Sequence, residues 1–343
     1  MKKLLNTLYV TTPEAYLTLE GENVVVLSEG SELGRMPLHN LDAILSFNYP
    51  GASPALMGAC AERDVDLCFF TPTNRFLARV VGPTHGSLAL RRAQYDWSKD
   101  SAKRLRAAQY FITGKIYNAR WVVERTLRDH AERVDAEKLS TVSARLAGYA
   151  REASSCADME ALRGLEAVSA SAYFSVFDDM IIGDKQHFSF SGRSRRPPLD
   201  RVNALLSFAY SLLAREAASA LTGVGLDPYL GFMHADRAGR ASLALDLMEE
   251  LRAPFADRFA LSLINRRMVE FKQFTRKEDG AVLMSDELRK QFLTAWQERK
   301  RETITHPYLD EKLSWGLVPH AQALLLSRWM RGDLDGYPPF LWK

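Results

Sequence analysis

The sequence predicts an α+β protein in which a small β-rich N-terminal domain, residues 1–86, precedes a larger helical domain, residues 87–343. Up to about residue 86 the chain consists of short apolar runs separated by turn residues, which is the pattern of strands. From about Leu88 onward the apolar residues recur at helical spacing. Between the two patterns lies Gly82-Pro83-Thr84-His85-Gly86, whose glycines and proline predict a linker.

In the first domain, Glu20-Gly21-Glu22-Asn23 predicts a hairpin turn between two strands. The first residues, M-K-K-L-L, resemble the start of a signal peptide. However, Asn6 and Thr7 interrupt the apolar run and no small-residue cleavage site follows, so we expect a strand. The expected strands are Leu4–Val10, Ala15–Glu20, Val24–Ser28, Leu41–Phe47, Val65–Thr71 and Phe76–Val81, with one helix at Pro54–Arg63.

In the second domain, apolar residues three and four positions apart predict a succession of helices. Asp200 follows a Pro-Pro-Leu run and is the expected N-cap of one of them. Another is expected to end at Pro254, because proline breaks a helix interior. The polar and basic stretch Lys185–Pro198 is expected to be a mobile loop. The expected helices are Ala102–Arg133, Met159–Ile181, Arg201–Leu221, Ser242–Arg252, Phe255–Phe274, Ser285–Thr303 and Pro319–Met330.

The composition is that of a globular protein, with 47% hydrophobic and 25% charged residues among 343. No apolar run is long enough to cross a membrane. The three cysteines, Cys60, Cys68 and Cys156, are odd in number and lack the spacing of zinc or redox motifs. We therefore expect buried free thiols in a reducing, cytoplasmic compartment, with no membrane partner.

Two segments carry a local basic excess although the net charge of the chain is only +3. Residues 91–133 contain eleven Lys and Arg against five Asp and Glu, and residues 185–201 contain five against one. Aromatic residues such as Trp97 and Tyr117 are interleaved in the first segment, which suits a nucleic-acid surface. Solvated helix faces are the alternative interpretation of both segments.

The most informative stretch is G231-F-M-H-A-D-R-A-G-R-A-S-L-A-L-D-L-M-E-E-L-R252, which holds His234 in a polar turn and then enters a largely apolar helix. Asp246, Glu249 and Glu250 lie within that helix, with Asp246 one turn from the other two. Carboxylates in apolar surroundings are costly unless they are paired, hydrogen-bonded or bound to a metal. A histidine just upstream indicates a cation site of oxygen and imidazole ligands, although a buried network with nearby arginines remains open.

Glu166 is the second unusual acid, in the helix L-R-G-L-E-A-V-S-A-S-A-Y-F, whose other members around it are apolar or small. Tyr173 lies two turns further on roughly the same face. A single glutamate of this kind is also compatible with a structural ion pair. Together with His234 and the acids of the later helix, it forms a set that suits Mg²⁺ or Mn²⁺ better than structural zinc. Such a site supports phosphoryl chemistry.

Other mechanisms have no motif to carry them. The sequence contains no G-x-S-x-G, no Walker A and no G-x-G-x-x-G. This argues against a serine elbow and against nucleotide hydrolysis or dinucleotide binding through these common motifs.

The chain resembles the spacer-integrating nuclease of CRISPR adaptation, the first of the two core CRISPR-associated adaptation proteins. The matching elements are L-R-G-L-E166-A, R-R-P-P-L-D-R-V-N203-A-L-L-S-F-A-Y210-S-L-L, and the stretch from G-L-D-P-Y-L-G-F-M-H234 to D246-L-M-E249-E. Within the family it is most similar to the form of the type I systems, subtype I-C. The resemblance implies a β-sandwich-like first domain and an all-α catalytic second domain.

The resemblance also implies a site and partners. Mg²⁺ or Mn²⁺ would be held by Glu166, His234 and Glu249, with Asp246 as a second acidic ligand or an orienting residue. The protein would form a homodimer through its first domain and a complex with the small second adaptation protein. It would join the 3′-hydroxyl of a short double-stranded DNA fragment to a phosphodiester at the edge of a CRISPR repeat. By analogy, candidate DNA contacts are Lys185, Arg193, Arg195, Arg196 and Tyr173; Asn203 and Tyr210 are expected to pack or support the site.

Two other functions remain open from the sequence. One is a non-catalytic helical DNA-binding scaffold whose acids form a buried ion-pair network. The other is a metal-dependent hydrolase of small phosphoesters, which would share the site but would not need the basic segments.

Overall fold

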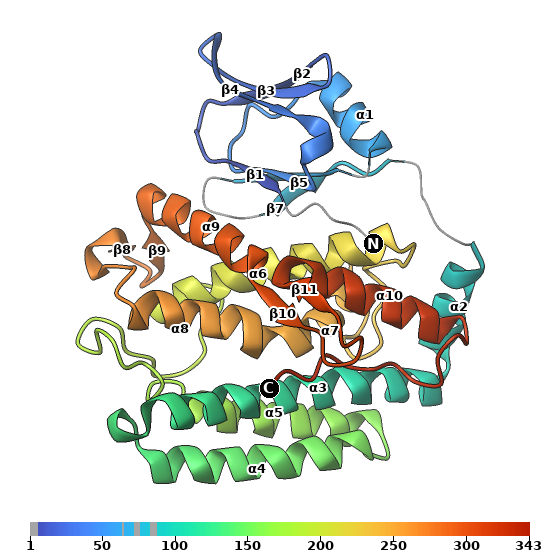
Figure 1. The fold of residues 1–343 in the computed structure, drawn as a ribbon, viewed down its shortest axis with the longest axis vertical. Coiled ribbons are helices and arrows are strands. Elements are labelled where there is room, and N and C mark those ends of the chain that lie inside the picture. The colour runs from blue at the N-terminus through green and yellow to red at the C-terminus, as the bar shows by residue number, and fades with distance from the viewer. Residues whose placement is uncertain (1–5, 64, 72–75, 83–87) are drawn as a thin grey trace. The chain divides into compact units, whose positions relative to one another are not determined.

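The computed structural model describes residues 6–63, 65–71, 76–82 and 88–343 (Figure 1). The chain forms two compact units: Met1–His85, Arg289–Thr303 and Ser314–Leu317 make the first, and Gly86–Leu288, Ile304–Leu313 and Val318–Lys343 make the second. The sequence predicts a single division at residue 86, whereas two later segments also belong to the first unit. The first residues of the expected strand Leu4–Val10 and most of the expected linker lie outside the described residues.

In its described residues, the first unit has two sheets that share one apolar core with helix α1. One sheet has the order β1-β5-β6-β7, with β1, β5 and β6 parallel and β7 antiparallel to β6; the other is the antiparallel meander β2-β3-β4. Leu17 and Val24 from the meander meet Ile44, Leu67 and Leu56 in this core. The elements are β1 Thr7–Val10, β2 Tyr16–Glu20, β3 Asn23–Ser28, β4 Ser31–Pro37, β5 Ala43–Ser46, α1 Pro54–Glu62, β6 Asp66–Phe70 and β7 Phe76–Arg79.

The predicted hairpin turn is confirmed, since Glu20 pairs with Asn23 across a two-residue loop. Gly21 opens that loop with a φ of +58°, a conformation that glycine adopts without strain. The strand β4 is absent from the sequence prediction. Its residues are mostly exposed and polar, so it carries no apolar alternation that would reveal it.

The second unit is built around the long helix α3, which packs against α2, α4, α5 and α7. Figure 1 shows α3, α4 and α5 side by side. The helices are α2 Leu88–Lys99, α3 Ser101–His130, α4 Ala136–Ser154, α5 Met159–Ser175, α6 Arg201–Gly223, α7 Ser242–Leu251, α8 Arg258–Asn265 and α10 Val318–Met330; α9, Asp286–Arg301, begins in this unit and continues in the first. The prediction of an α+β protein with a helical second part is confirmed. Among the described residues, no helix is long and apolar enough to span a bilayer.

Side-chain caps fix where several of these helices begin. Asp200 accepts a hydrogen bond from the backbone amide of Asn203 at 2.7 Å, so the predicted N-cap of α6 is confirmed. Asp158 caps α5 in the same way through Ala161 at 2.8 Å. The start of α5 is therefore set by local chemistry, and this helix carries Glu166.

The predicted helix Ser242–Arg252 is confirmed as α7, which ends at Leu251, but the chain does not leave the helical path at Pro254. The chain passes from α7 through a π-helical turn, Arg252–Asp257, directly into α8. Proline has no amide hydrogen to donate, and a widened turn accommodates its ring without ending the helix. Two other helices are shorter than predicted. The helix predicted to end at Ile181 is α5, which ends at Ser175, and the helix predicted to end at Phe274 is α8, which ends at Asn265.

The second part is not purely helical. After α8 the chain forms the hairpin of β8 Phe274–Arg276 and β9 Val282–Met284, and a second two-stranded sheet contains β10 Thr303–Thr305 and β11 Lys312–Ser314.

The C-terminal segment is fastened to the centre of the helical unit by two buried side chains. Asn118 of α3 donates to the carbonyls of Glu250 and Phe340 at 2.6 Å each and accepts from the amide of Trp342 at 2.8 Å. Glu250 of α7 accepts from the amide of Phe340 at 2.6 Å and from the hydroxyl of Tyr337. Burial raises the pKa of Glu250 to about 7 against these hydrogen bonds. Glu250 therefore holds the C-terminal segment in place through its hydrogen bonds, unlike its neighbour Glu249.

Candidate active site

Asp246 organises the turn that precedes α7. Its Oδ2 accepts from the amides of Phe232 and Met233 at 2.7 and 3.0 Å, and its Oδ1 accepts from the amide of His234 at 3.0 Å. The turn runs so close to α7 that a Cβ at Gly231 would lie 2.7 Å from Ser242 Cβ and 2.9 Å from Asp246 Oδ2. Glycine is needed at this point for the turn to wrap around the carboxylate.

The same carboxylate orients the histidine, because Oδ1 of Asp246 lies 2.6 Å from Nδ1 of His234. An ionised carboxylate only accepts hydrogen bonds, so Nδ1 carries the proton and Nε2 is the basic nitrogen. With four hydrogen bonds on its two oxygens, Asp246 has its acceptor positions occupied. These contacts suit the orienting role that the sequence analysis gives Asp246, and direct ligation of a metal by Asp246 stays a prediction.

Two carboxylates from different helices converge on one ammonium group. Nζ of Lys115, in the middle of α3, forms ion pairs with Glu166 of α5 and with Oε2 of Glu249 of α7, the latter at 3.0 Å. Nη1 of Arg252 lies 2.9 Å from the same Glu249 oxygen. The Glu249 side chain is 3% exposed and that of Glu166 is 31% exposed, so Glu166 forms the solvent side of the cluster.

The charges of this cluster keep Glu249 ionised. Burial raises the pKa of Glu249, but Arg252, Lys115 and His234 together outweigh burial and lower the pKa to about 2. His234 is thus close enough to act on Glu249 electrostatically. A buried carboxylate that stays ionised among cations is suited to holding a positive ligand.

A small cavity of about 40 Å³ adjoins Glu166 and is lined by Tyr173, Tyr210 and Arg195 among others. Tyr173 and Tyr210 both donate their hydroxyls to Asp257, at 3.1 and 2.5 Å. Tyr173 is 4% exposed, so its ring is not available to stack on a base in this structure. Burial raises the pKa of both tyrosine hydroxyls, which therefore stay protonated.

The segment Lys185–Pro198 follows a defined path along α6. Asn203 fastens it by donating to the carbonyl of Gly192 at 2.8 Å and accepting from the amide of Ser194 at 3.1 Å. Arg193 donates to Asn203 and lies with its guanidinium 5.0 Å from the centre of the Tyr210 ring. Nζ of Lys185 is 3.4 Å from Asp178. Arg195 and Arg196 are exposed, and of these two only Arg195 reaches the cavity beside Glu166.

The predicted three-ligand metal site is only partly assembled. Within the part of the chain that the structure describes, no three His, Cys, Asp or Glu side chains lie close enough together to hold a metal ion. The donor chemistry nevertheless fits a divalent cation, because Glu166 and Glu249 already share one cation and Nε2 of His234 has no hydrogen bond among the described residues. The ammonium of Lys115 takes the position between the two carboxylates.

Sequence reasoning missed Lys115 and did not foresee the role of Asp257. Lys115 follows Phe111 and precedes Ala119 by four residues each, so it lies on the buried face of α3. A lysine on an apolar helical face is the signal that could have identified it. The partners of Lys115 lie 51 and 134 positions away in the sequence, beyond the range of any helical spacing.

The fold and this site define a two-part α+β protein whose helical part carries a carboxylate and imidazole cluster. Residues 8–298 match the family model for the CRISPR associated protein Cas1. The chain is 50% identical over 343 residues to a CRISPR-associated endonuclease Cas1 of Chlorobaculum tepidum, covering 100% of both chains. It is also 50% identical to one from Rhodospirillum rubrum over 350 residues, again covering 100% of both. The chain belongs to the Cas1 family.

Solved structures share the fold at low sequence identity. A Cas1 protein from Thermotoga maritima matches with a TM-score of 0.82 at 21% identity, covering 97% of this chain and 99% of that one. A casposase bound to integration product matches with a TM-score of 0.82 at 20% identity, covering 98% of this chain and 93% of the casposase.

Proposed function

We propose that this protein is a metal-dependent DNA endonuclease and integrase that inserts short DNA fragments into a CRISPR array. The observation that carries the proposal is the convergence of Glu166 and Glu249 on one cation, beside a histidine that Asp246 orients. Relatives that are 50% identical over their full length are named CRISPR-associated endonucleases, which supports the nuclease activity. The casposase of similar fold was solved with an integration product, which is consistent with strand joining.

Mg²⁺ or Mn²⁺ would be held by Glu166, Glu249 and Nε2 of His234. When bound, it would supply Lewis acidity at the phosphate and orient the attacking hydroxyl. Asp246 keeps the proton of His234 on Nδ1, and Arg252 keeps Glu249 ionised.

In the proposed reaction, the 3′-hydroxyl oxygen of the fragment forms a new bond to phosphorus. The bond from phosphorus to the 3′-oxygen of the repeat strand breaks, and that oxygen leaves as a hydroxyl after taking up a proton. One phosphodiester replaces another, so neither ATP nor a covalent enzyme intermediate is needed.

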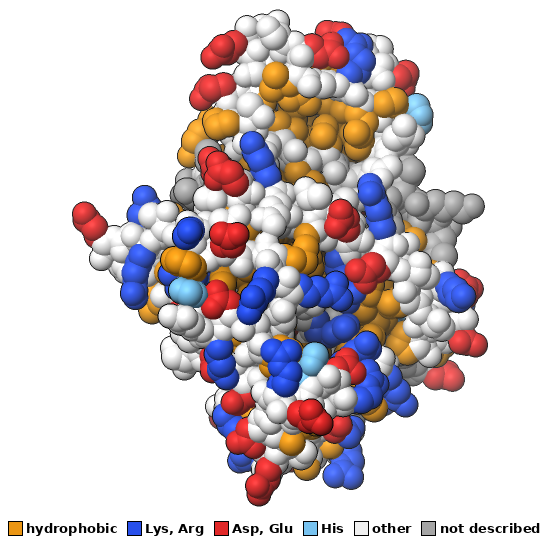
Figure 2. Space-filling model, turned by 60° about the vertical axis from the view of Figure 1, so that its left-hand side comes forward, with side chains coloured by type: hydrophobic (Ala, Val, Ile, Leu, Met, Phe, Trp, Pro, Cys, Tyr) orange, Lys and Arg blue, Asp and Glu red, His pale blue; other side chains and the backbone are white. Residues whose placement is uncertain are grey.

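Basic side chains support DNA as the substrate. Figure 2 shows Lys and Arg side chains gathered over the helical part of one face, among scattered acids. Arg195 lines the cavity beside Glu166 and is the strand contact that the geometry favours, with Arg196 next to it. Lys185 is paired with Asp178 and Arg193 with Asn203, so these two fit a role in shaping the segment.

We further propose a homodimer and a complex with the small second adaptation protein. A solved complex whose name contains Cas1 and Cas2 shares this fold with a TM-score of 0.80. The assignment to the subtype I-C form stays a prediction from the sequence.

The test is an integration assay on a supercoiled plasmid that carries a CRISPR repeat. It contains a labelled double-stranded fragment, the small partner protein, and either Mn²⁺ or EDTA. Label transfer is expected with Mn²⁺ only, to be lost in Glu166→Ala and kept in Glu160→Ala, an exposed acid of the same helix. Transfer that persists in Glu166→Ala would contradict the assignment. A small phosphodiester in place of DNA tests the general hydrolase.

A non-catalytic scaffold is favoured by one observation, namely that Lys115, Glu166, Glu249 and Arg252 are already paired with one another. In that case the acids serve stability alone, and Glu166→Ala lowers the melting temperature while wild type shows no transfer under any condition. If the site is catalytic, the half-exposed Glu166 contributes little to stability, about 1 kcal/mol or less. Thermal melts beside the integration assay separate the two functions.

A further inference from the structure

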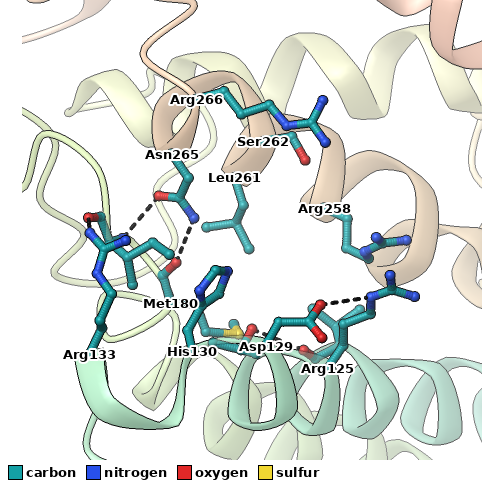
Figure 3. A pocket seen from close by; sticks show the side chains of 13 residues that line it. Arg125, Asp129, His130, Arg133, Met180, Arg258, Leu261, Ser262, Asn265 and Arg266 are labelled. Carbon is teal, nitrogen blue, oxygen red and sulfur yellow. Dashed lines mark hydrogen bonds and ion pairs between the residues drawn. The ribbon is translucent and has the colours of Figure 1, made fainter.

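A basic cavity, distinct from the acidic cluster, lies between the C-terminal end of α3 and helix α8. It is a cavity of about 370 Å³, shown in Figure 3, and it lies entirely within the helical unit. We call it the arginine pocket. Its polar lining includes Arg125, His130, Arg133, Arg258, Ser262 and Arg266.

The lining of the arginine pocket has an excess of positive charge. Among the described residues that line it are four arginines and a single acid, Asp129. Asp129 is shared, because Nε of Arg125 and Nε of Arg128 each lie 3.1 Å from one of its oxygens. Arg133 donates to the neutral carbonyl of Ile182 at 2.7 Å. Figure 3 shows the His130 ring between Arg133 on one side and Arg125 on the other.

One buried tryptophan holds two of the arginines together. The Trp342 ring centre lies 4.5 Å from the guanidinium carbon of Arg258 and 5.8 Å from that of Arg125. Trp342 is itself fixed, since its amide donates to Asn118 of α3 at 2.8 Å. The ring therefore brings the guanidinium groups of Arg125 and Arg258 to one place between α3 and α8, where a bound anion would lie near both.

The size and the remaining lining restrict what kind of anion fits. The volume lies at the lower end of the range for small-molecule sites, so a single nucleotide unit fits whereas a duplex does not. Val122, Met180 and Leu261 give the cavity an apolar part that suits a sugar or base. Guanidinium groups recognise phosphate through paired hydrogen bonds, and a terminal phosphate carries nearly two negative charges at neutral pH.

We propose that the arginine pocket binds the terminal phosphate of a nucleotide, carried either by a free mononucleotide or by the 5′ end of a DNA strand. The site is separate from the acidic cluster: Lys115 and Arg125 are ten residues apart on α3, or about 15 Å along its axis. The proposal goes beyond the proposed reaction and does not rest on it.

The test is a binding experiment in EDTA, which prevents metal-dependent cleavage. Two single-stranded oligonucleotides, labelled at the 3′ end and differing only in a 5′-phosphate or 5′-hydroxyl, are titrated by fluorescence anisotropy. Titration of dAMP, with deoxyadenosine as the uncharged comparison, is followed by calorimetry. The wild type is expected to prefer the phosphate by about tenfold, which corresponds to about 1.4 kcal/mol, because the phosphate adds charge-assisted hydrogen bonds from the guanidinium groups.

Two variants probe the pocket in different ways. Arg266→Gln removes a charge from an exposed side chain, and Ser262→Met fills the cavity without changing any charge. Arg267→Gln is the matched control, because Arg267 is the exposed neighbour of Arg266 and does not line the pocket. Thermal melts establish that each variant folds; if Ser262→Met does not, Arg266→Gln decides.

The outcomes divide cleanly. Phosphate preference that is lost in Arg266→Gln and Ser262→Met but kept in Arg267→Gln supports the pocket. If dAMP binds to the wild type and its binding is lost in the same two variants, the free nucleotide is the ligand. If dAMP does not bind and only the 5′-phosphorylated oligonucleotide shows these losses, the ligand is a DNA end. No preference for phosphate in either arm, or an equal loss in Arg267→Gln, would overturn the proposal in favour of a general basic surface.

Discussion

Nδ1 of His234 lies 2.6 Å from Oδ1 of Asp246, and the amide of the same histidine lies 3.0 Å from the same oxygen. One carboxylate oxygen therefore fixes both the backbone and the ring of His234. Because the proton of the neutral imidazole is kept on Nδ1, Nε2, which faces away from Asp246, is the nitrogen that can offer a lone pair to a metal.

Asp246→Asn is expected to weaken Mn²⁺ binding by about ten- to hundredfold, because the amide cannot replace all four accepted hydrogen bonds and no longer selects the histidine tautomer. Isothermal titration with Mn²⁺ measures the change. Asp236→Asn, an exposed acid of the same turn, is the control and should bind as wild type does. Unchanged affinity in Asp246→Asn would show that His234 is not a ligand.

Lys115→Met is expected to destabilise the metal-free protein by about 2 kcal/mol, since Glu249 loses one of its two charged partners and Glu166 loses its own. Mn²⁺ should restore much of this loss, because a bound ion stabilises the folded state. Melting temperatures with and without Mn²⁺ provide the measurement. Lys103→Met, on an exposed part of the same helix, should change little in either condition. A Lys115→Met protein that Mn²⁺ leaves unaffected would argue for purely structural ion pairs.

Asp257 is expected to make stability depend on pH between about 4 and 6. Burial raises its pKa from 3.8 to about 6, against the lowering effect of Tyr210 and Arg252. The folded state then binds the proton more tightly than the unfolded state, so this group destabilises above pH 6 by about 3 kcal/mol and the cost fades as pH falls to about 4.

Urea unfolding of wild type and Asp257→Asn from pH 4.5 to 7.5 tests this expectation. The wild type should gain stability relative to the variant as the pH falls, and groups common to both cancel in the difference. A difference that does not vary with pH would mean that Asp257 is ionised throughout.

Asn118→Ala is expected to lower the free energy of unfolding by about 3 kcal/mol, because it leaves buried backbone groups at Glu250, Phe340 and Trp342 without a partner. It should also weaken phosphate binding by the arginine pocket. Trp342→Leu separates the loss of stability from the loss of binding, since it removes the ring that contacts Arg125 and Arg258 but keeps the hydrogen bond from the backbone amide to Asn118. Full phosphate binding in Trp342→Leu would contradict the role given to this ring.

Local signals revealed much of the helical unit. The acids of α7 were recognisable because carboxylates stood among leucines at one-turn spacing, and Asp200 was recognisable as a cap from the residues around it. The π-helical turn that contains Pro254 was not predicted, because such a turn depends on the packing of the whole helix and not on the sequence next to the proline.

The partners within the site were beyond sequence reasoning. Periodicity assigns Lys115 to a buried face but cannot say which acids meet it there. The arginine pocket is hidden for the same reason: Arg125 and Arg258 lie 133 positions apart in the sequence, and what unites them is a tryptophan at the far end of the chain.

The π-helical turn at Arg252–Asp257 sets the rotational phase between α7 and α8. In an α-helix each residue advances the side chains by about 100°, so removing one residue from this turn would swing every side chain of α8 by about that angle. Glu249 would keep its place, while Arg258 and Ser262 would face away from α3. The π-helical turn therefore fixes how the arginine pocket is oriented relative to the acidic cluster. We expect this short segment to tolerate residue substitutions far better than insertions or deletions.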